Sequence, residues 1–215
     1  MSSRWIAIGD VHGCADELED LLALLSPVEG DRVVLLGDLV NRGPASHRVV
    51  QLARREGFLG LMGNHEHRLL AYRREPREDL LKRYDYATLG QLTEEDWAYL
   101  GTLRATLEPP GGPFVLVHGG FLPGIPWREQ SLEQVCRTKW VHPPGAPEGA
   151  DPVHWSDLWG GPERVLYGHT PGPEVRVSAH ALGLDTACVY GGKLTACLLP
   201  GMELVQVPAR RSYVA

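Results

Sequence analysis

Five short polar clusters that contain glycine follow apolar runs with the character of buried strands. The clusters occupy residues 9–13, 37–43, 63–66, 117–120 and 168–170. Between the first two, leucines at positions 18, 21, 22 and 25 have the spacing of one helix face, which predicts a helix over 15–25. Strand, helix and turn in this order predict a parallel sheet with crossover helices. Because the carboxyl ends of such strands lie side by side, the clusters should converge on one site.

The remaining pattern adds further strands and an unusual loop. Strands are predicted at 5–8, 33–36, 58–62, 114–117, 164–167, 175–178, 182–184, 193–199 and 203–207. A second helix is predicted over 44–55, with Pro44 in its first turn, and a polar helical stretch over 65–107 includes a helix capped by Thr93. Residues 120–160, rich in Pro, Gly and Trp, predict an ordered but irregular loop. We expect an α/β sandwich of two sheets with flanking helices, built as a single domain over residues 1–215.

Composition and charge narrow the class of protein. The chain has 43% hydrophobic and 22% charged residues, which is typical of a globular protein with a packed core. Its formal net charge of −6 argues against a dedicated nucleic-acid surface. The four cysteines form no CxxC pair, which favours buried free thiols in a reducing compartment. No apolar run is long enough to span a bilayer, so a cytoplasmic protein without a membrane partner is expected.

The clusters supply oxygen and imidazole groups suited to two divalent metal ions. The expected ligands are Asp10, His12 and Asp38 for one ion, and Asp38, Asn64, His118 and His169 for the other. Carboxylate, amide and imidazole together favour manganese, with iron, cobalt, zinc or nickel as alternatives, over calcium. Two such ions lower the pKa of a bridging water, so that a hydroxide attacks, and they clamp a phosphoryl oxygen for in-line displacement.

Taken one at a time, these residues have ordinary structural explanations. Asp10 could cap a helix, His118 could be a hydrogen-bonded core histidine, and Asn64 could belong to a turn. Only their joint occurrence at strand ends favours a metal site. The other histidines lack that context, and we interpret them as surface or structural residues: His47, His67, His142, His154 and His180.

Several neighbouring residues are candidates for catalysis and substrate binding. His65 follows a predicted ligand directly and is the candidate general acid, which with Asn64 would also contact substrate. Arg42 is the candidate phosphate-binding group. Glu66 is expected to hold His65 or a ligand histidine in place. Arg137 is a candidate second phosphate contact, as is Lys139, although a solvated surface position is the favoured interpretation of both.

The motifs GDVHG, GDLVNRG, GNHE, HGG and GHT, which begin at positions 9, 37, 63, 118 and 168, resemble those of the calcineurin-like metallophosphoesterases. More narrowly, they resemble the PPP type and its bacterial branch, which includes symmetrical diadenosine-tetraphosphate hydrolases and bacterial serine/threonine protein phosphatases. The late stretch 183–196 is similar to the same branch. The resemblance implies a four-layer αββα sandwich of two mixed sheets with a dinuclear centre. It also implies the same six ligands, His65 as the catalytic histidine and Arg42 as the phosphate-binding arginine.

Asn41 departs from the protein phosphatases, which usually carry Asp at this position to orient and charge the catalytic histidine. An amide can still accept a hydrogen bond from His65, but it adds no negative charge that would raise the pKa of the ring. Asn41 is therefore a third candidate catalytic residue. A phosphate is a better leaving group than an alkoxide and needs less acid assistance, so this departure favours phosphoanhydride substrates.

We therefore expect a two-metal phosphoesterase that cleaves dinucleoside polyphosphates such as diadenosine tetraphosphate symmetrically, or that cleaves related phosphoanhydrides. The alternative is a phosphomonoesterase or serine/threonine phosphoprotein phosphatase, and a more distant one is a non-catalytic metal-binding module. The expected partner is accordingly a nucleotide, another phosphorylated small molecule or a phosphoprotein. The sequence leaves the oligomeric state open.

Overall fold

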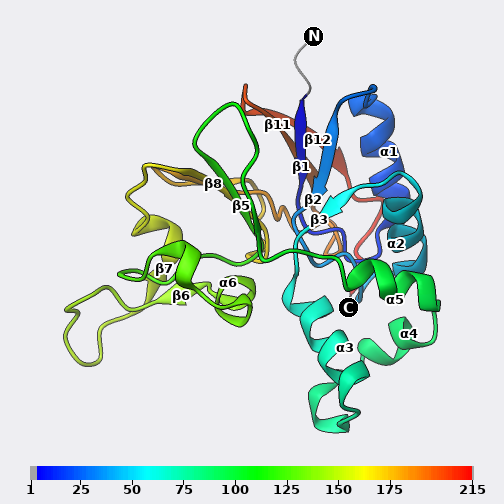
Figure 1. The fold of residues 1–215 in the computed structure, drawn as a ribbon, viewed down its shortest axis with the longest axis horizontal. Coiled ribbons are helices and arrows are strands. Elements are labelled where there is room, and N and C mark those ends of the chain that lie inside the picture. Colours follow the sequence, from blue (N-terminus) through cyan, green and yellow to red (C-terminus); the bar gives the residue numbers. More distant parts are fainter. Residues whose placement is uncertain (1–3, 215) are drawn as a thin grey trace.

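The computed structural model describes residues 4–214, which form two mixed five-stranded sheets packed face to face (Figure 1). The first sheet has the order β12 (Glu203–Pro208), β11 (Lys193–Leu199), β1 (Trp5–Ile8), β2 (Arg32–Leu35) and β3 (Leu59–Gly60). The second has the order β4 (Thr106–Leu107), β5 (Phe114–Val117), β8 (Arg164–Tyr167), β10 (Ala181–Gly183) and β9 (Arg176–Val177). In the first sheet β1, β2 and β3 are parallel, as are β5, β8 and β10 in the second, while β11, β12, β4 and β9 each pair antiparallel with their neighbours.

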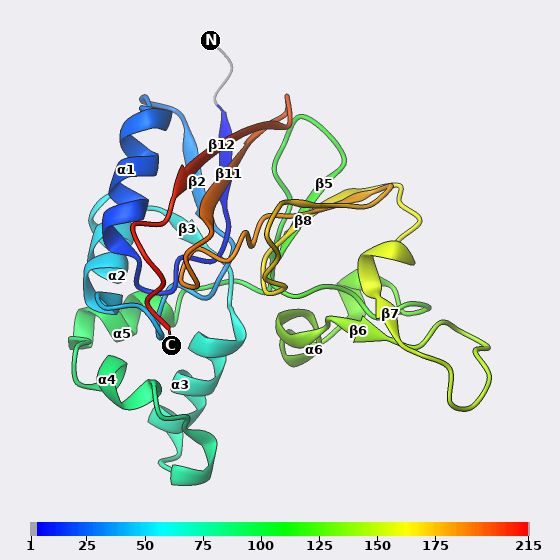
Figure 2. The same ribbon diagram turned by 180° about the vertical axis from the view of Figure 1, so that it is seen from behind.

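Apolar side chains from both sheets form the central core. Ala7 and Val34 of the first sheet pack with Leu116 and Leu166 of the second, and all four are fully buried. Helices α1 (Ala15–Leu25) and α2 (Ser46–Arg55) cover the outer face of the first sheet (Figure 2). The segment 121–160 covers the outer face of the second sheet. These four layers confirm the predicted αββα sandwich.

The segment 121–160 is more regular than predicted. It contains η2 (Trp127–Glu129), α6 (Leu132–Arg137), β6 (Trp140–Val141), β7 (Val153–His154) and η3 (Trp155–Asp157). Helix α6 begins with a capping box, in which Ser131 Oγ accepts from the Gln134 N–H (3.3 Å) and the Gln134 side chain accepts from the Ser131 N–H (2.8 Å). The expectation of an irregular loop was therefore wrong here, whereas its ordered character is confirmed because Trp127 and Trp155 are buried.

The polar helical stretch lies beyond the carboxyl ends of β1 and β2 (Figure 1). It comprises α3 (Asn64–Arg74), η1 (Glu78–Leu80), α4 (Asp85–Leu89) and α5 (Glu94–Leu100). Thr93 caps α5 as predicted, since its side chain accepts from the Asp96 N–H (3.3 Å). Helix α2 begins two residues after Pro44, and the two-residue strand β4 was not predicted.

Two further expectations concern cysteines and membranes. All four cysteines are free and buried, as predicted. Within residues 4–214, each helix is too short or too polar to cross a bilayer.

Candidate metal centre

The five polar clusters meet at the carboxyl ends of β1, β2, β5 and β8 and at the first turn of α3. Two groups of possible metal-binding side chains form there. The first contains His12, Asp38 and His65, and the second contains Asp38, His118 and His169. Within each group the candidate ligand atoms lie within 4.8 Å of one another, and Asp38 belongs to both groups. The sequence therefore predicted both the convergence and the central place of Asp38.

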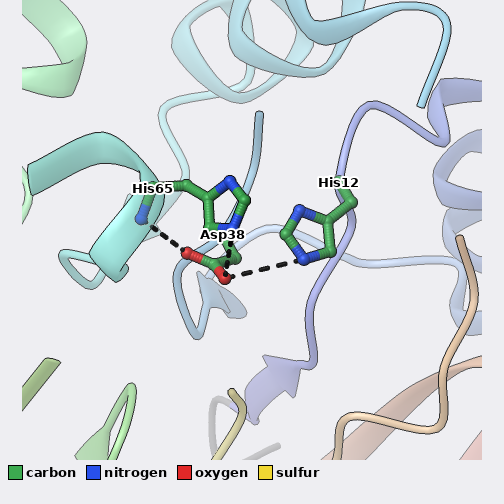
Figure 3. Close-up of side chains that lie close together, drawn as sticks. All are labelled: His12, Asp38 and His65. Carbon is green, nitrogen blue, oxygen red and sulfur yellow. Dashed lines mark hydrogen bonds and ion pairs between the residues drawn. The ribbon is translucent and has the colours of Figure 1, made fainter. Parts of the chain in front are cut away.

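Figure 3 shows how the Asp38 carboxylate faces its neighbours. Its Oδ2 lies 3.5 Å from His12 Nε2 and 3.8 Å from His65 Nε2. Its Oδ1 accepts the backbone N–H of His65 (3.1 Å) and lies 3.4 Å from His118 Nε2. One carboxylate thus reaches imidazoles that come from both sheets.

Backbone carbonyls orient two of these imidazoles. His12 Nδ1 donates to the Val40 carbonyl (2.9 Å), and His118 Nδ1 donates to the Leu36 carbonyl (2.8 Å). In a neutral ring that is protonated at Nδ1, the lone pair is on Nε2, the atom that would bind a metal, and the hydrogen bond from Nδ1 fixes the ring plane. Gly37 makes this packing of His118 possible, because a Cβ at that position would lie 2.6 Å from His118 Nδ1. The residues present therefore fit a pair of divalent cations.

Asp10 and Asn64 lie beside these groups. Both oxygens of the Asp10 carboxylate accept the backbone N–H of His169, at 3.0 and 3.1 Å, which links β1 to the loop after β8. Asn64 Oδ1 lies 3.2 Å from His118 Nε2. Both positions are compatible with the expected ligand set, which stays a prediction for all six residues.

Several residues of the centre have left-handed backbone conformations that non-glycine residues seldom adopt. They are His12 (φ 45°), Asp38 (φ 47°), Asn41 (φ 72°), Arg42 (φ 67°) and His169 (φ 65°). Such strain gathers at functional sites, where the surrounding structure holds it in place. Because His12 has left the extended conformation, the alternation of side chains along a strand does not extend from Asp10 to His12.

Glu66 holds the loop after β2 rather than a histidine. Its buried carboxylate accepts the backbone N–H groups of Asp38 (3.0 Å), Leu39 (2.8 Å), Val40 (3.1 Å) and Gly63 (3.2 Å). The expected contact with His65 or a ligand histidine is therefore replaced by support of the Asp38 backbone. The loop that carries Asp38 is joined to the start of α3.

The centre carries surplus negative charge. Burial alone would lower the pKa of His118, but the charges of Asp38, Asp10 and Glu66 raise it to about 10. Burial and the nearby Asp185 raise the pKa of Asp10 well above its ordinary range. Divalent cations would neutralise this negative charge. Without them, a proton on His118 supplies part of the compensating positive charge.

His65 is buried and neutral. Burial, reinforced by the nearby charges of Arg42 and Arg68, lowers its pKa to about 2 against the opposing effect of Asp38. Its Nδ1 faces the side-chain nitrogen of Asn41 at 2.9 Å. The amide therefore donates to His65, which corrects the expectation that it would accept.

Arg42 is held between two tyrosine rings beside the metal groups. Its guanidinium carbon lies 5.6 Å from the centre of the Tyr84 ring and 5.5 Å from that of Tyr190, and its Nη1 donates to His12 Nε2 (3.2 Å). Arg42 thus lies beside the first ligand group, and its role as the phosphate-binding residue stays a prediction. Arg137, in contrast, has an exposed side chain that pairs with Glu133 at 3.8 Å, so its role as a phosphate contact stays a prediction.

Other residues of the centre were not singled out from the sequence. Asp185 follows β10 closely, and burial together with Asp38 raises its pKa to about 6. A carboxylate just after an apolar run is the same signal that identified Asp10 and Asp38, so it could have been found. Tyr84 stacks on His65 with ring centres 5.1 Å apart, and no sequence pattern marked it. His154 is buried and structural, as predicted, with hydrogen bonds to Ser156 and Thr170.

The two mixed sheets and the imidazole–carboxylate centre at one edge define a metal-dependent phosphoesterase. The chain belongs to the calcineurin-like phosphoesterase family, whose model matches residues 3–199. It is 28% identical over 242 residues to an asymmetrical bis(5′-nucleosyl)-tetraphosphatase, PrpE, of Halalkalibacterium halodurans, covering 97% of this chain and 95% of that protein. The PrpE of Bacillus subtilis is 29% identical over 236 residues, covering 96% and 95% of the two chains.

Solved structures agree with this assignment. A protein described provisionally as a diadenosine tetraphosphatase superposes with a TM-score of 0.82 at 33% identity, covering 97% of this chain and 95% of that one. A Saccharomyces cerevisiae serine/threonine phosphatase similar to human PP5 superposes with a TM-score of 0.64 at 14% identity, covering 97% and 80%, which shows a shared fold. The bacterial branch expected from the motifs is therefore confirmed.

Proposed function

We propose that this enzyme hydrolyses dinucleoside polyphosphates such as diadenosine tetraphosphate. The observation that carries the proposal is that Asp38 belongs to both ligand groups, with His65 in the first group and Arg42 beside it. The tetraphosphatase activity for which the PrpE relatives are named supports the substrate class, and these relatives match nearly the whole chain. Those names specify asymmetrical cleavage, so we propose the asymmetrical reaction in place of the symmetrical one expected from the motifs.

Each side chain has a distinct task in this proposal. The proposed ligands of two divalent cations, for which manganese is proposed, are Asp10, His12, Asp38, Asn64, His118 and His169. Such a pair supplies an activated water and neutralises charge on the phosphoryl group. Arg42 binds phosphate oxygens through its planar fork, and the tyrosines on either side restrict its movement. His65 presents Nε2 to the leaving oxygen. We also propose that Arg137 is a second phosphate contact. We propose further that the chain forms a single domain and that the protein is cytoplasmic.

A substrate panel with product analysis tests the function. Purified protein with Mn²⁺ is given diadenosine tetraphosphate, a phosphoserine peptide and p-nitrophenyl phosphate, and products are separated by ion-exchange chromatography. We expect fastest turnover of the dinucleotide, with ATP and AMP as products, whereas symmetrical cleavage would yield only ADP. His65→Asn should lower kcat by roughly 10²–10⁴-fold, and the exposed His142→Asn should leave it unchanged. Turnover of the monoesters without any of the dinucleotide would refute the proposal.

A further inference from the structure

Asp85, at the start of α4, has a fully buried carboxylate that contacts the side chain of Asn41. Its Oδ1 accepts from Asn41 Nδ2 (2.8 Å). Arg68 donates to both Asp85 oxygens (2.8 Å each), and the backbone N–H of Lys82 donates to Oδ2 (2.6 Å). A carboxylate paired in this way only accepts hydrogen bonds, so the Asn41 atom that faces it must be the amide nitrogen. The reverse orientation would bring the Asn41 oxygen against the Asp85 oxygen.

The orientation of this amide determines which nitrogen of His65 carries the proton. Asn41 Nδ2 lies 2.9 Å from His65 Nδ1, and Arg68 Nη2 lies 3.4 Å from the same atom. Both neighbours are donors, so Nδ1 must present its lone pair. A neutral imidazole carries one proton, which is then on Nε2. Nε2 is the ring atom that faces Asp38 and the metal groups.

We propose that Asp85 is a positioning residue that acts through Asn41 to fix His65 in the Nε2–H tautomer. The inference deepens the proposed function and rests on it where it concerns the substrate. A neutral imidazole with a bare Nδ1 donates a hydrogen bond to the leaving oxygen and keeps its proton, because full transfer would leave an imidazolate. As the P–O bond breaks, the electron pair stays on the leaving oxygen.

This tautomer favours one class of leaving group. A departing phosphate is stable as an anion and needs only the hydrogen bond, whereas an alkoxide needs a proton. The Asp85–Asn41–His65 chain therefore selects phosphoanhydrides over alkyl phosphomonoesters. The charge that a protein phosphatase of this fold would place beside the histidine is moved one side chain away, to Asp85.

Nitrogen NMR of the histidine rings tests the tautomer without reference to activity. The full chain carries ¹⁵N-labelled histidine, in the metal-free and Zn²⁺-loaded states, and His65→Asn identifies the His65 signals. We expect a bare Nδ1 and a protonated Nε2 in the wild type, and loss of this preference in Asp85→Ala. The control Asp79→Ala removes an exposed carboxylate that pairs with Arg77 in the same stretch, and it should not change the tautomer. A protonated Nδ1 in the wild type would overturn the inference, as would an unchanged tautomer in a folded Asp85→Ala protein.

The exchange variant Asn41→Asp/Asp85→Asn keeps the net charge and the shape of the pair, so it is an informative second variant where Asp85→Ala does not fold. The carboxylate at position 41 should accept a hydrogen bond from the Nδ1–H of His65. The proton of the ring would then be on Nδ1 and no longer on Nε2. We expect the ratio of diadenosine tetraphosphate turnover to phosphoserine-peptide turnover to fall about tenfold or more. Reversal of the tautomer with an unchanged ratio would overturn the selection of leaving groups. If the wild type does not cleave the dinucleotide, the proposed function fails, while the NMR result still decides the tautomer.

Discussion

Arg42 combines a fixed charge with a restricted side chain. Its guanidinium lies between the rings of Tyr84 and Tyr190, and Tyr190 is tied to the chain end by a backbone bridge to Ser212. A side chain that is already confined loses less conformational entropy when it binds a ligand. The planar fork also matches two phosphate oxygens, which the point charge of a lysine does not.

Arg42→Lys is therefore expected to weaken substrate binding although it keeps the positive charge. Loss of one charge-assisted hydrogen bond of about 1.5–3 kcal/mol corresponds to a rise of roughly tenfold or more in KM for diadenosine tetraphosphate. Steady-state kinetics with Mn²⁺ measures the change. Arg128→Lys is the matched control, because Arg128 also lies over an aromatic ring, Trp127, but in the segment that covers the second sheet. An unchanged KM in Arg42→Lys would contradict the assignment.

For Asn41, the sequence predicted a place in the centre but not the direction of the hydrogen bond to His65. Its position beside Arg42 marked it as a candidate, because the second motif places both residues after one strand. The direction of its hydrogen bond was predicted wrongly, since an amide can donate or accept and its partners decide which. The deciding partner, Asp85, lies 44 residues away in a stretch without strand-end character. No local pattern connects the two.

At the scale of elements, the register of β1 and β2 places the metal-binding loops side by side. Ile8 pairs with Leu35, so the two strands end together and Asp10 and Asp38 follow within three residues. The start of this pair is held by Asp31, which accepts from the Arg4 backbone N–H and from its Nε (both 3.0 Å) and from the Val28 N–H (3.0 Å). The Arg4–Asp31 pair therefore fixes the strands at the end opposite the centre.

This pair makes stability depend on pH in a defined direction. The hydrogen bonds from Arg4 lower the pKa of Asp31 to about 2, from an ordinary value of 3.8. The folded chain then binds this proton less readily than the unfolded chain, so the stabilisation is present above pH 3.8 and disappears as the pH falls towards 2. Because the Arg4 side chain is 36% exposed, solvent screening limits the effect to about 1 kcal/mol.

Arg4→Met should accordingly lower the free energy of unfolding near pH 7 and have less effect at pH 3. Urea denaturation followed by circular dichroism at both pH values measures the difference. Glu148→Gln, which changes an exposed carboxylate in the segment 121–160, is the control and should show no such dependence. An equal loss of stability at both pH values would show that Arg4 acts through packing and not through Asp31.

Elements with strong periodicity were predicted well, and weaker ones were not. Helix α1 and strands β1, β5, β8 and β11 have the bounds expected from their apolar patterns. Helix α6 was missed even though Ser131 and Gln134 form a capping box, because the surrounding Pro and Gly residues suggested a loop. Strand β4 has only two residues and is defined by its antiparallel pairing with β5. This pairing is a tertiary contact that the local sequence does not reveal.

At the scale of the whole molecule, the metal centre spans the boundary between the two sheets. His12 and Asp38 come from loops of the first sheet, and His118 and His169 come from loops of the second. The sheets also pack through the apolar core, and hydrogen bonds from His169 to Asp10 and from His118 to the Leu36 carbonyl join them at the centre. A cation held by ligands from both sheets binds only the folded arrangement, and its binding free energy therefore stabilises the fold.

Metal binding should consequently raise the melting temperature, and Asp38 should control the effect because it belongs to both ligand groups. At a Mn²⁺ concentration of about 100 times Kd the stabilisation is about 2.7 kcal/mol. For a chain of this length that amounts to a rise in Tm of roughly 5–10 °C. Scanning calorimetry with and without EDTA measures the rise, and elemental analysis of the dialysed protein counts the bound ions. Asp38→Asn should lose both ions and the rise in Tm, whereas the exposed His142→Ala should keep them. Retention of one full equivalent of metal by Asp38→Asn would show that the two groups bind independently, and Asp38 would then not be the residue that joins them.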